Sequence, residues 1–421
     1  MSVLEHFKNI AAIPHCSFDA VKLKDYLIDY AKSKGFSVEC DKAENILCKK
    51  GNPKICLQSH YDMVCVGDAP NIKISETDGF LKAHNSTLGA DNGIGIAIMM
   101  EAMKEFSDLE CLFTANEEVG LLGANNLELA ITSDALLNLD SECVDRVIIG
   151  CAASLMMDVN AKLTYKKPSK KYLYEAKTKG YKGGHSGIDI VKNIPSAISD
   201  LALFLYKNDA EIVSFSGGER TNSISVNARA VFYSDAKLSS TNDIEITELN
   251  FCEQNVIDND ILSRIASYKH GVWSYSNELG IVKTSVNLAI VKNENDSLKI
   301  ELFARSDNTK DLDEILYKTK AHFMGYEVIL KDSDEPWEPV PNKFTYLVLD
   351  TLKKYNPKAY MSSIHAGLEC GVLKKIKPSL LCASIGPNIL SPHSVDERCE
   401  ISTIEIIKKT TFDLIKSYKG D

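Results

Sequence analysis

Acidic and imidazole side chains stand beside the short apolar segments in the first part of this chain, where they could bind metal ions. Imidazole and carboxylate groups are the usual ligands of hard or borderline divalent cations. Asp91 is the central candidate, because small and turn-forming residues precede it and a nearly unbroken apolar run to Met100 follows it. Two interpretations of Asp91 stay open at this point: it bridges two metal ions, or it caps the N-terminus of a helix. The set in this part of the chain is His60, Asp62, Asp91, Glu117, Glu118 and Asp140.

Three buried strands must position these side chains. Apolar residues predict the strands at Lys54–Ser59, Glu110–Ala115 and Ala135–Leu139, and members of the set directly follow each one. Helical segments separate the strands, and this alternation predicts an α/β sheet. Because ligands of open α/β sheets lie beyond the carboxyl ends of the strands, we expect the set to converge on one edge.

A further histidine, His393, follows a strand expected at Leu380–Ile385 and completes a set of ligands for two metal ions. If Asp91 bridges, each metal receives the bridge, one histidine and one other carboxylate, which leaves a position for water. Neighbouring Glu117 and Glu118 leave their strand in different directions, so one can bind metal while the other acts as a base. Asp62, two residues after His60, suits a supporting role. The candidate ligands are His60, Asp91, Glu118, Asp140 and His393.

The middle of the chain has a different pattern, which predicts an inserted domain. Apolar residues alternate in 224–232, 286–290 and 298–302, as in an antiparallel sheet with one covered face. Helices expected at Asn193–Leu205 and Asp311–Phe323 would cover that face, and the proline-rich, acidic segment Asp332–Pro341 is the best linker candidate. We therefore expect a catalytic α/β domain whose first part is 1–160, an inserted α+β domain at 161–335, and a second catalytic part at 336–421.

Composition excludes several classes of function. The net charge is −10, which argues against a nucleic-acid partner, since a phosphate-binding surface is basic. Nowhere do 18 apolar residues run together, and the N-terminus has no leader-like pattern, so we expect no membrane association. The twelve cysteines include no Cys-x-x-Cys pair and are scattered through apolar segments, as expected of reduced, buried thiols. We therefore expect a cytoplasmic protein.

Five motifs, which run in order along the chain, resemble those of the dinuclear zinc aminoacylase and carboxypeptidase superfamily. They are LQSHYDMV at 57–64, STLGADNGIG at 86–95, NEEVG at 116–120, NLDSE at 138–142 and LSPHSVD at 390–396. Within the superfamily the chain is similar to the aminoacyl-histidine dipeptidases, also called cytosol non-specific dipeptidases or dipeptidase D. That likeness depends on the second motif, on GGHSG at 183–187, and on IHAGLECG at 364–371.

The resemblance implies roles for the acidic and histidine residues. His60, Asp91 and Asp140 would bind one metal, and Glu118, His393 and the shared Asp91 would bind the other. Glu117 would be the general base, Asp62 would support the site, and the Asp91–Asn92 peptide bond would be cis. The cofactors expected are two divalent metal ions, with zinc as the first choice and manganese or cobalt as the alternatives.

The resemblance also implies a zinc-peptidase-type sheet with helices on both faces and an inserted lid that recognises substrate. His185 would stabilise the oxyanion, or it is a hydrogen-bonded turn histidine. Arg305 would bind the substrate carboxylate through its forked guanidinium, or it is a surface arginine. Asn222 would make a polar contact to substrate, while His365 and Glu369 would read the free α-amino group or order their loop.

The function expected from the sequence is metal-dependent hydrolysis of dipeptides with a free N-terminus, either Xaa-His peptides or a broad range. The alternatives on the same scaffold are an N-acyl amino-acid deacylase and a tripeptidase. A non-catalytic module that binds peptide or metal is a third hypothesis, and the presence of Glu117 argues against it. Short peptides are the expected partners, with a homodimer through the lid domain as a further expectation.

Overall fold

The chain forms two compact units in a computed structural model that describes residues 2–420. Unit 1 comprises Met1–Gly150, Pro339–Ser363 and Leu368–Asp421, and unit 2 comprises Cys151–Glu338 and Ile364–Gly367. The boundary expected between residues 160 and 161 falls inside a strand of unit 2, β9 (Ala153–Lys162). Buried and partly buried residues already alternate from Ala153, the first residue of β9, which lies before the expected boundary.

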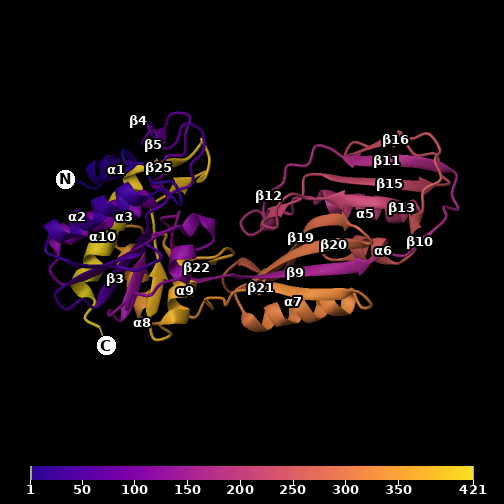
Figure 1. Ribbon diagram of the computed structural model, residues 1–421. Coiled ribbons are helices and arrows are strands. Elements are labelled where there is room, and N and C mark those ends of the chain that lie inside the picture. The colour runs from indigo at the N-terminus through magenta and orange to yellow at the C-terminus, as the bar shows by residue number, and fades with distance from the viewer. Residues whose placement is uncertain (1, 421) are drawn as a thin grey trace. The chain divides into compact units, whose positions relative to one another are not determined.

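An eight-stranded sheet forms the centre of unit 1, in the order β1-β2-β6-β3-β7-β23-β8-β22 (Figure 1). Its four middle strands, β6, β3, β7 and β23, are parallel; in the register, Leu57 pairs with both Cys111 and Leu137. Their carboxyl ends therefore meet at one edge. The strands are β1 (Ser37–Cys40), β2 (Ile46–Lys50), β3 (Ile55–His60), β6 (Leu109–Thr114), β7 (Ala135–Asn138), β8 (Arg146–Cys151), β22 (Tyr360–Ile364) and β23 (Leu381–Ser384).

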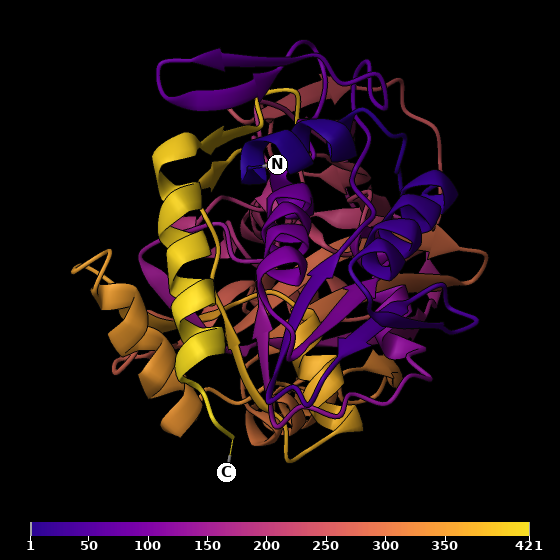
Figure 2. The same cartoon turned by 90° about the vertical axis from the view of Figure 1, so that its left-hand side faces the viewer.

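Helices cover both faces of this sheet, as the sequence predicts. Every residue of β3 and β6 is buried, which explains why these strands read as continuous apolar runs. Figure 2 shows α2, α3 and α10 side by side over one face. That face is covered by α1 (Val3–Ala11), α2 (Val21–Ser33), α3 (Ala90–Glu105), α8 (Lys343–Lys353) and α10 (Ile401–Ser417), and the other by α4 (Leu122–Asn125) and α9 (Glu369–Ile376).

A small sheet in unit 1 fixes the loop that carries His393. Its order is β24-β25-β5-β4, and Arg398 of β25 pairs with Lys82 of β5. The loop 391–397 joins β24 to β25, so both of its ends are held by strands. The strands are β4 (Ile74–Thr77), β5 (Phe80–Ala83), β24 (Ile389–Leu390) and β25 (Arg398–Glu400).

Unit 2 contains the predicted antiparallel sheet, in the order β16-β11-β15-β13-β19-β20-β9-β21, with β18 paired to β19 (Figure 1). Three helices share its core, α5 (Ala197–Lys207), α6 (Ile261–Ser267) and α7 (Thr309–His322). The strands are β9 (Ala153–Lys162), β11 (Tyr172–Thr178), β13 (Glu211–Gly217), β15 (Ala228–Ser234), β16 (Ile244–Glu248), β18 (Gly271–Ser276), β19 (Ile281–Glu294), β20 (Ser297–Ser306) and β21 (Glu327–Ser333). Two short pairs accompany the sheet, β10 (Tyr165–Lys166) with β17 (Val256–Ile257), and β12 (Gly184–His185) with β14 (Ser223–Ile224).

Two details of unit 2 differ from the expectation. A bulge in β19 between Leu288 and Ile290 shifts the alternation, so that Val291 joins Val286 and Leu288 in the core in place of Ile290. The expected linker is also partly ordered, because β21 reaches Ser333 and the buried Trp337 accepts a hydrogen bond from the Cys151 N–H at 2.9 Å.

The cysteines depart from the expectation in one place. Cys16 and Cys65 form a disulfide across 49 residues of separation, so the expectation that all the cysteines are reduced is wrong for this pair. The two residues lie far apart in the sequence, and only the fold brings their loops together. The other ten cysteines form no disulfide, and seven of them are buried.

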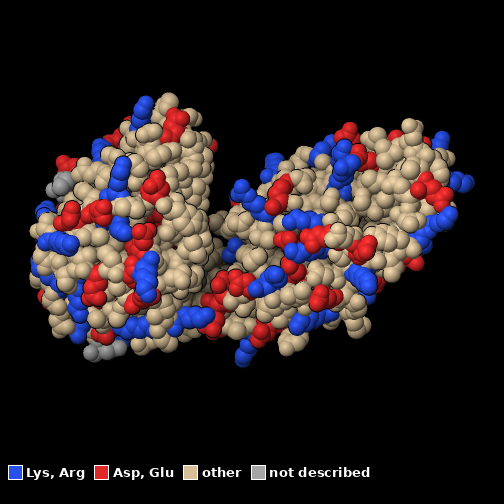
Figure 3. All heavy atoms as spheres, viewed as in Figure 1, with Lys and Arg blue, Asp and Glu red and all other residues tan. Residues whose placement is uncertain are grey.

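Two expectations about surfaces can be compared with the described residues. None of the helices within residues 2–420 combines the length and apolar character that crossing a bilayer requires. Figure 3 shows basic and acidic side chains interspersed over the face in view. This mixture is unlike the continuous basic stripe of a nucleic-acid-binding surface.

Candidate metal centre

The carboxyl edge of the unit 1 sheet presents the predicted acidic and imidazole groups. His60 is the last residue of β3, and Asp140 lies two residues beyond the end of β7. Glu117 and Glu118 open the 3-10 turn η1 (Glu117–Val119), which follows β6 through a left-handed residue, Asn116. The parallel register of these strands is the reason that residues separated by up to 80 positions reach one place.

Asp91 enters this edge from the first turn of α3. Gly89, with a φ of +69°, is the N-cap, and the Asp91–Asn92 bond is cis, as expected. Asp91 therefore occupies the helix-entry position that the sequence allowed, but its side chain reaches two histidines. Its Oδ1 lies 3.1 Å from His60 Nε2, and its Oδ2 lies 3.1 Å from His393 Nε2.

The donor atoms form two groups that share Asp91. One group contains His60, Asp91 and Asp140, and the other contains Asp91, Glu118 and His393; within each, the donor atoms lie within 4.8 Å of one another. These are the two ligand sets expected from the sequence. A third group at the same spacing contains His60 with Glu117 and Glu118, so Glu117 lies beside the ligands as well.

Asp62 connects the strand end to the turn that carries the glutamates. Its Oδ1 accepts a hydrogen bond from the Glu117 N–H at 2.9 Å, and its Oδ2 accepts from the Ser17 hydroxyl at 2.7 Å. The ring of His60 donates from Nδ1 to the Asp62 main-chain oxygen at 3.0 Å. In the neutral ring this bond leaves the lone pair on Nε2, which faces Asp91 and Asp140. Asp62 is buried and holds several groups at once.

Several carboxyl groups are crowded together at this edge. Burial raises the pKa of Glu117 well above its usual range, and burial also raises the pKa values of Glu118 and Asp140. Although burial opposes a charged imidazole, hydrogen bonds to Asp91 and Glu118 raise the pKa of His393 to about 11. Crowded carboxylates of this kind are stabilised when positive charge is supplied.

The residues therefore fit a pair of divalent cations. Each group of three offers nitrogen and oxygen donors, the combination that zinc and related ions bind. Within residues 2–420, the buried Glu118 Oε1 makes no hydrogen bond. An unpartnered carboxylate oxygen in a buried position is costly, and coordination would satisfy it.

Comparison with known proteins agrees with this geometry. The model of peptidase family M20/M25/M40 matches residues 56–417. The chain belongs to this family. The matched residues include every candidate metal ligand, from His60 to His393, and the M20/M25/M40 protein is accordingly a peptidase.

Relatives of this M20/M25/M40 peptidase include dipeptidases. The cytosol non-specific dipeptidase of Escherichia coli (strain K12) is 31% identical over an alignment of 453 positions, which covers 94% of this chain and 93% of the relative. The aminoacylhistidine dipeptidase from Vibrio alginolyticus has a crystal structure that matches with a TM-score of 0.84 and 26% identity, covering 100% of this chain and 97% of that one. A tripeptidase from Staphylococcus aureus shares the fold, with a TM-score of 0.61 and 17% identity, over 98% of this chain and 97% of that one.

Unit 2 of the M20/M25/M40 peptidase contains His185, the predicted oxyanion residue, and three of the predicted substrate-binding residues, Asn222, Arg305 and His365. His185 lies on β12, and the main-chain oxygen of Asn222 accepts a hydrogen bond from the Ser186 N–H at 2.9 Å. A Cβ atom placed on Gly187 would lie 3.1 Å from Arg305 Nε, 2.5 Å from the His365 oxygen and 3.2 Å from His185 Cε1. Gly187 thus marks the point where these side chains and loops meet.

The hydrogen bonds of this cluster indicate which histidine nitrogens carry a hydrogen. The N–H groups of Gly187 and Ile188 donate to His185 Nδ1, so in the neutral ring Nε2 carries the hydrogen and is a donor. His365 Nε2 lies 2.8 Å from the Ser285 hydroxyl. Burial, with the nearby charge of Arg305, lowers the pKa of His365 to about 3, so this ring is neutral near pH 7.

Arg305 is a buried residue on β20 rather than a surface arginine, and 7% of it is exposed. Its guanidinium lies 4.7 Å from the centroid of the Phe303 ring, and its Nε has no hydrogen-bond partner among the described residues. Burial lowers the pKa of Arg305 to about 10, which still leaves it charged near pH 7. A buried cation with an unpaired N–H suits an anionic ligand.

Glu369, the remaining predicted substrate-binding residue, belongs to unit 1 and is the first residue of α9. Its side chain is fully buried and accepts hydrogen bonds from Gln58 Nε2 at 2.5 Å and from the Thr114 hydroxyl at 2.7 Å. Gln58 in turn accepts from Asn138 Nδ2 at 2.6 Å. Burial raises the pKa of Glu369 to about 7. These contacts join Glu369 Oε2 to β3 and β6, while Glu369 Oε1 has no hydrogen-bond partner among the described residues.

Sequence reasoning missed three residues of the centre. Ser17 supports Asp62, Glu397 lies behind Asp91, and Glu142 adds a further carboxylate, whose pKa is raised to about 8 by burial and by the charges of Asp91 and Asp140. Glu142 has a sequence signal, since it is two residues after Asp140 and shares the i, i+2 spacing of His60 and Asp62. Ser17 and Glu397 have none that distinguishes them from surface residues.

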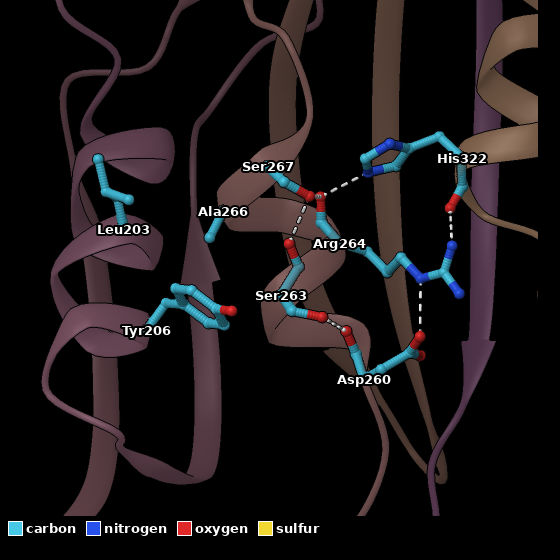
Figure 4. A pocket seen from close by; sticks show the side chains of 8 residues that line it. All are labelled: Leu203, Tyr206, Asp260, Ser263, Arg264, Ala266, Ser267 and His322. Atoms are coloured by element: carbon cyan, nitrogen blue, oxygen red, sulfur yellow. Dashed lines mark hydrogen bonds and ion pairs between the residues drawn. The ribbon is translucent and has the colours of Figure 1, made fainter.

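A pocket of about 440 Å³ in unit 2 contains none of the predicted site residues. Its walls come from α5, α6 and the end of α7, and Figure 4 shows its one ion pair, Arg264 with Asp260 at 2.7 Å. The Arg264 guanidinium also donates to the His322 main-chain oxygen. The hydroxyls of Ser263 and Ser267 donate to the main-chain oxygens of Asp260 and Ser263, and none of the lining residues belongs to the candidate metal centre.

Proposed function

We propose that the protein is a two-metal dipeptidase that hydrolyses short peptides with a free N-terminus. The observation that carries the proposal is the pair of ligand groups sharing Asp91, with Glu117 beside them. Membership of the peptidase family and likeness over nearly the whole chain to a dipeptidase support the substrate class. Zinc is the proposed metal, because nitrogen and carboxylate donors suit it, with manganese and cobalt as alternatives.

We assign the metals to the residues as the sequence suggested: His60, Asp91 and Asp140 hold one ion, and Asp91, Glu118 and His393 hold the other. Bound there, two divalent cations would supply Lewis acidity that polarises the scissile carbonyl and lowers the pKa of the attacking water. Glu117 would take the proton from that water and pass it to the leaving amine, a task that its raised pKa suits. Asp62 would keep Glu117 in place through the hydrogen bond from the Glu117 N–H.

The cluster in unit 2 would recognise the remainder of the substrate. Arg305 would bind the terminal carboxylate, since its buried guanidinium has an unpaired N–H. His185 would donate from Nε2 to the developing oxyanion, and Asn222 and His365 would add polar contacts. We propose a cytoplasmic location on the likeness to a protein named for the cytosol, although the Cys16–Cys65 disulfide is unusual for that compartment.

The test is a panel of dipeptides, including Xaa-His and β-Ala-His, assayed with metal-depleted protein and after addition of zinc, manganese or cobalt. We expect amino-acid release that depends on added metal. Glu117→Gln should lower kcat by about 10²- to 10⁴-fold while bound metal stays at the parent level. Glu128→Gln, a change of the same type at an exposed surface residue, is the control and should leave kcat unchanged.

Each alternative function predicts a different outcome of this panel. Turnover of N-acylated amino acids with inactivity on free dipeptides would identify a deacylase, and preference for tripeptides would identify a tripeptidase. Metal binding without hydrolysis of any substrate would identify a binding module. A Glu117→Gln variant that retains metal and hydrolyses as fast as the parent would refute the assignment of the base.

A further inference from the structure

The side chain of Glu397 accepts hydrogen bonds from four consecutive main-chain N–H groups. Its Oε2 accepts from Leu88 at 2.7 Å and Gly89 at 3.2 Å, and its Oε1 accepts from Ala90 at 2.8 Å and Asp91 at 3.4 Å. Glu397 is 3% exposed, so water does not compete for these bonds. Both oxygens of one buried carboxylate are therefore committed to the segment that ends at Asp91.

Two of these amides, those of Ala90 and Asp91, are the first of α3, and those of Leu88 and Gly89 directly precede it; main-chain donors at a helix start have no partner inside the helix. The N-cap Gly89 has no side chain that could accept from them, and its φ of +69° turns the chain sharply into Asp91. Glu397 supplies from outside the helix the acceptors that these main-chain donors need. The main chain of Asp91 is thus held by a residue 306 positions later in the sequence.

Glu397 also belongs to the loop that carries His393. The Glu397 N–H donates to the Ser394 oxygen at 3.1 Å, and the next residue, Arg398, begins β25. His393 Nε2 lies 3.1 Å from Asp91 Oδ2. One loop therefore contacts Asp91 twice. The His393 imidazole lies beside the Asp91 side chain, and the Glu397 carboxylate accepts from the Asp91 main-chain N–H.

We propose that Glu397 is a positioning residue of the metal centre, which fixes the main chain of Asp91 relative to His393 so that the Asp91 carboxylate can be shared between two cations. This inference rests on the proposed function, because it assumes that two metal ions share the Asp91 carboxylate. It acts through Asp91, since all four of its hydrogen bonds to the α3 segment go to main-chain groups and none to a ligand side chain.

The experiment replaces Glu397 by glutamine, which keeps the shape of the side chain. A glutamine has one carbonyl oxygen, and its NH₂ group would face amide N–H donors that need an acceptor. We expect E397Q to bind Zn²⁺ about 10- to 100-fold more weakly, measured by titration of metal-depleted protein. We also expect an altered visible absorption spectrum of the Co²⁺-loaded protein, because the geometry at the shared ligand changes, and a lower kcat with a smaller change in KM.

Asp396→Asn is the matched control, because it removes the same charge from the adjacent, exposed residue of the same loop. This variant should keep the parent's Zn²⁺ affinity and Co²⁺ spectrum. Parent-like affinity and spectrum in a folded E397Q protein would overturn the proposal. A loss of thermal stability alone would also overturn it, since a purely structural role would lower stability without moving the Co²⁺ spectrum.

A measurement on the unaltered protein tests the same inference if E397Q does not fold. Hydrogen exchange of the amides of Leu88–Asp91 should be slow in the metal-free parent, because a buried carboxylate holds them independently of metal. Fast exchange at these amides beside slow exchange in the rest of α3 would overturn the proposal. The metal titration, the Co²⁺ spectrum and the exchange measurement need no turnover. Failure of dipeptide hydrolysis in the parent would therefore refute the proposed function, while these three measurements would still test the role of Glu397.

Discussion

Removal of the Cys16–Cys65 disulfide should destabilise unit 1 by about 4 kcal/mol. The two cysteines are 49 positions apart, and closing a loop of that length removes about 14 cal/mol/K of entropy from the unfolded chain. At 25 °C this equals about 4 kcal/mol, or roughly a thousandfold in the unfolding equilibrium. The perturbation is the double variant Cys16→Ser with Cys65→Ser, which leaves the remaining ten cysteines as they are.

The assay must report unit 1 separately, because both tryptophans, Trp273 and Trp337, belong to unit 2. Hydrogen exchange of peptides from β3 and α3, followed through increasing urea, reports unit 1, while tryptophan emission reports unit 2. We expect the variant's exchange transition to move to lower urea with a much smaller change in the emission transition. Thiol titration of the unreduced, denatured parent should find ten reactive thiols, and twelve after reduction.

Cys40→Ser is the control, since Cys40 is an exposed free cysteine of the same unit. It should leave the unit 1 transition at the parent position. Equal transitions in the parent and the double variant would refute the loop-closure argument. Twelve reactive thiols in the unreduced parent would refute the disulfide itself.

Two further predictions concern His270 in unit 2 and Gly95 in α3. The pKa of His270 is lowered to about 4 by burial, so between pH 6.5 and 4 the unfolded state binds a proton that the folded state does not, and stability falls as the pH falls through that window. The variant His270→Gln can still accept a hydrogen bond from the Leu288 N–H. Between pH 7 and 5 its free energy of unfolding should fall by about 2 kcal/mol less than that of the parent, as measured by urea unfolding followed by tryptophan emission. Equal decreases in the two proteins would contradict the assignment. Gly95→Ala would place a Cβ 2.0 Å from Asn92 Oδ1 and 2.4 Å from Ser59 Oγ, and should cost about 1–3 kcal/mol by overpacking, measured by thermal unfolding. A parent-like melting temperature would show that this contact relaxes freely.

Most of the sheet of unit 1 could be predicted because its parallel strands are buried on both faces. Short continuous apolar runs such as Ile55–Leu57 are typical of strands that helices cover on both sides, and the groups at their ends follow from the strand direction. His60, Glu117, Glu118 and Asp140 were predictable for the same reason, since strand ends in a parallel sheet meet whatever the distance in sequence. Asp91 and His393 do not follow from strand direction, because Asp91 lies at the start of α3 and His393 lies in the loop 391–397. Helix bounds in unit 2 were also close, as shown by α7, expected at Asp311–Phe323 and found at Thr309–His322.

The remaining features depend on contacts that a linear pattern does not contain. The β19 bulge changes which of Ile290 and Val291 faces the core, although both are apolar and β-branched. The Cys16–Cys65 bond depends on two loops meeting, and neither cysteine lies in a recognisable pair. In the sequence alone Glu397 cannot be distinguished from other acidic loop residues, because its hydrogen bonds to the start of α3 exist only in the folded chain.

The position of β23 in the unit 1 sheet has a consequence for the order in which the protein can be completed during synthesis. This strand lies between β7 and β8, although it is formed by residues that follow the whole of unit 2 in the sequence. A nascent chain that has produced only the first 338 residues lacks the strand that joins the two parts of the sheet, and it lacks His393 and Glu397 as well. Unit 2, in contrast, is almost complete at that stage. Hydrolytic competence is therefore deferred until the last part of the chain has been made, and a truncated product would carry most of the ligands without a working centre.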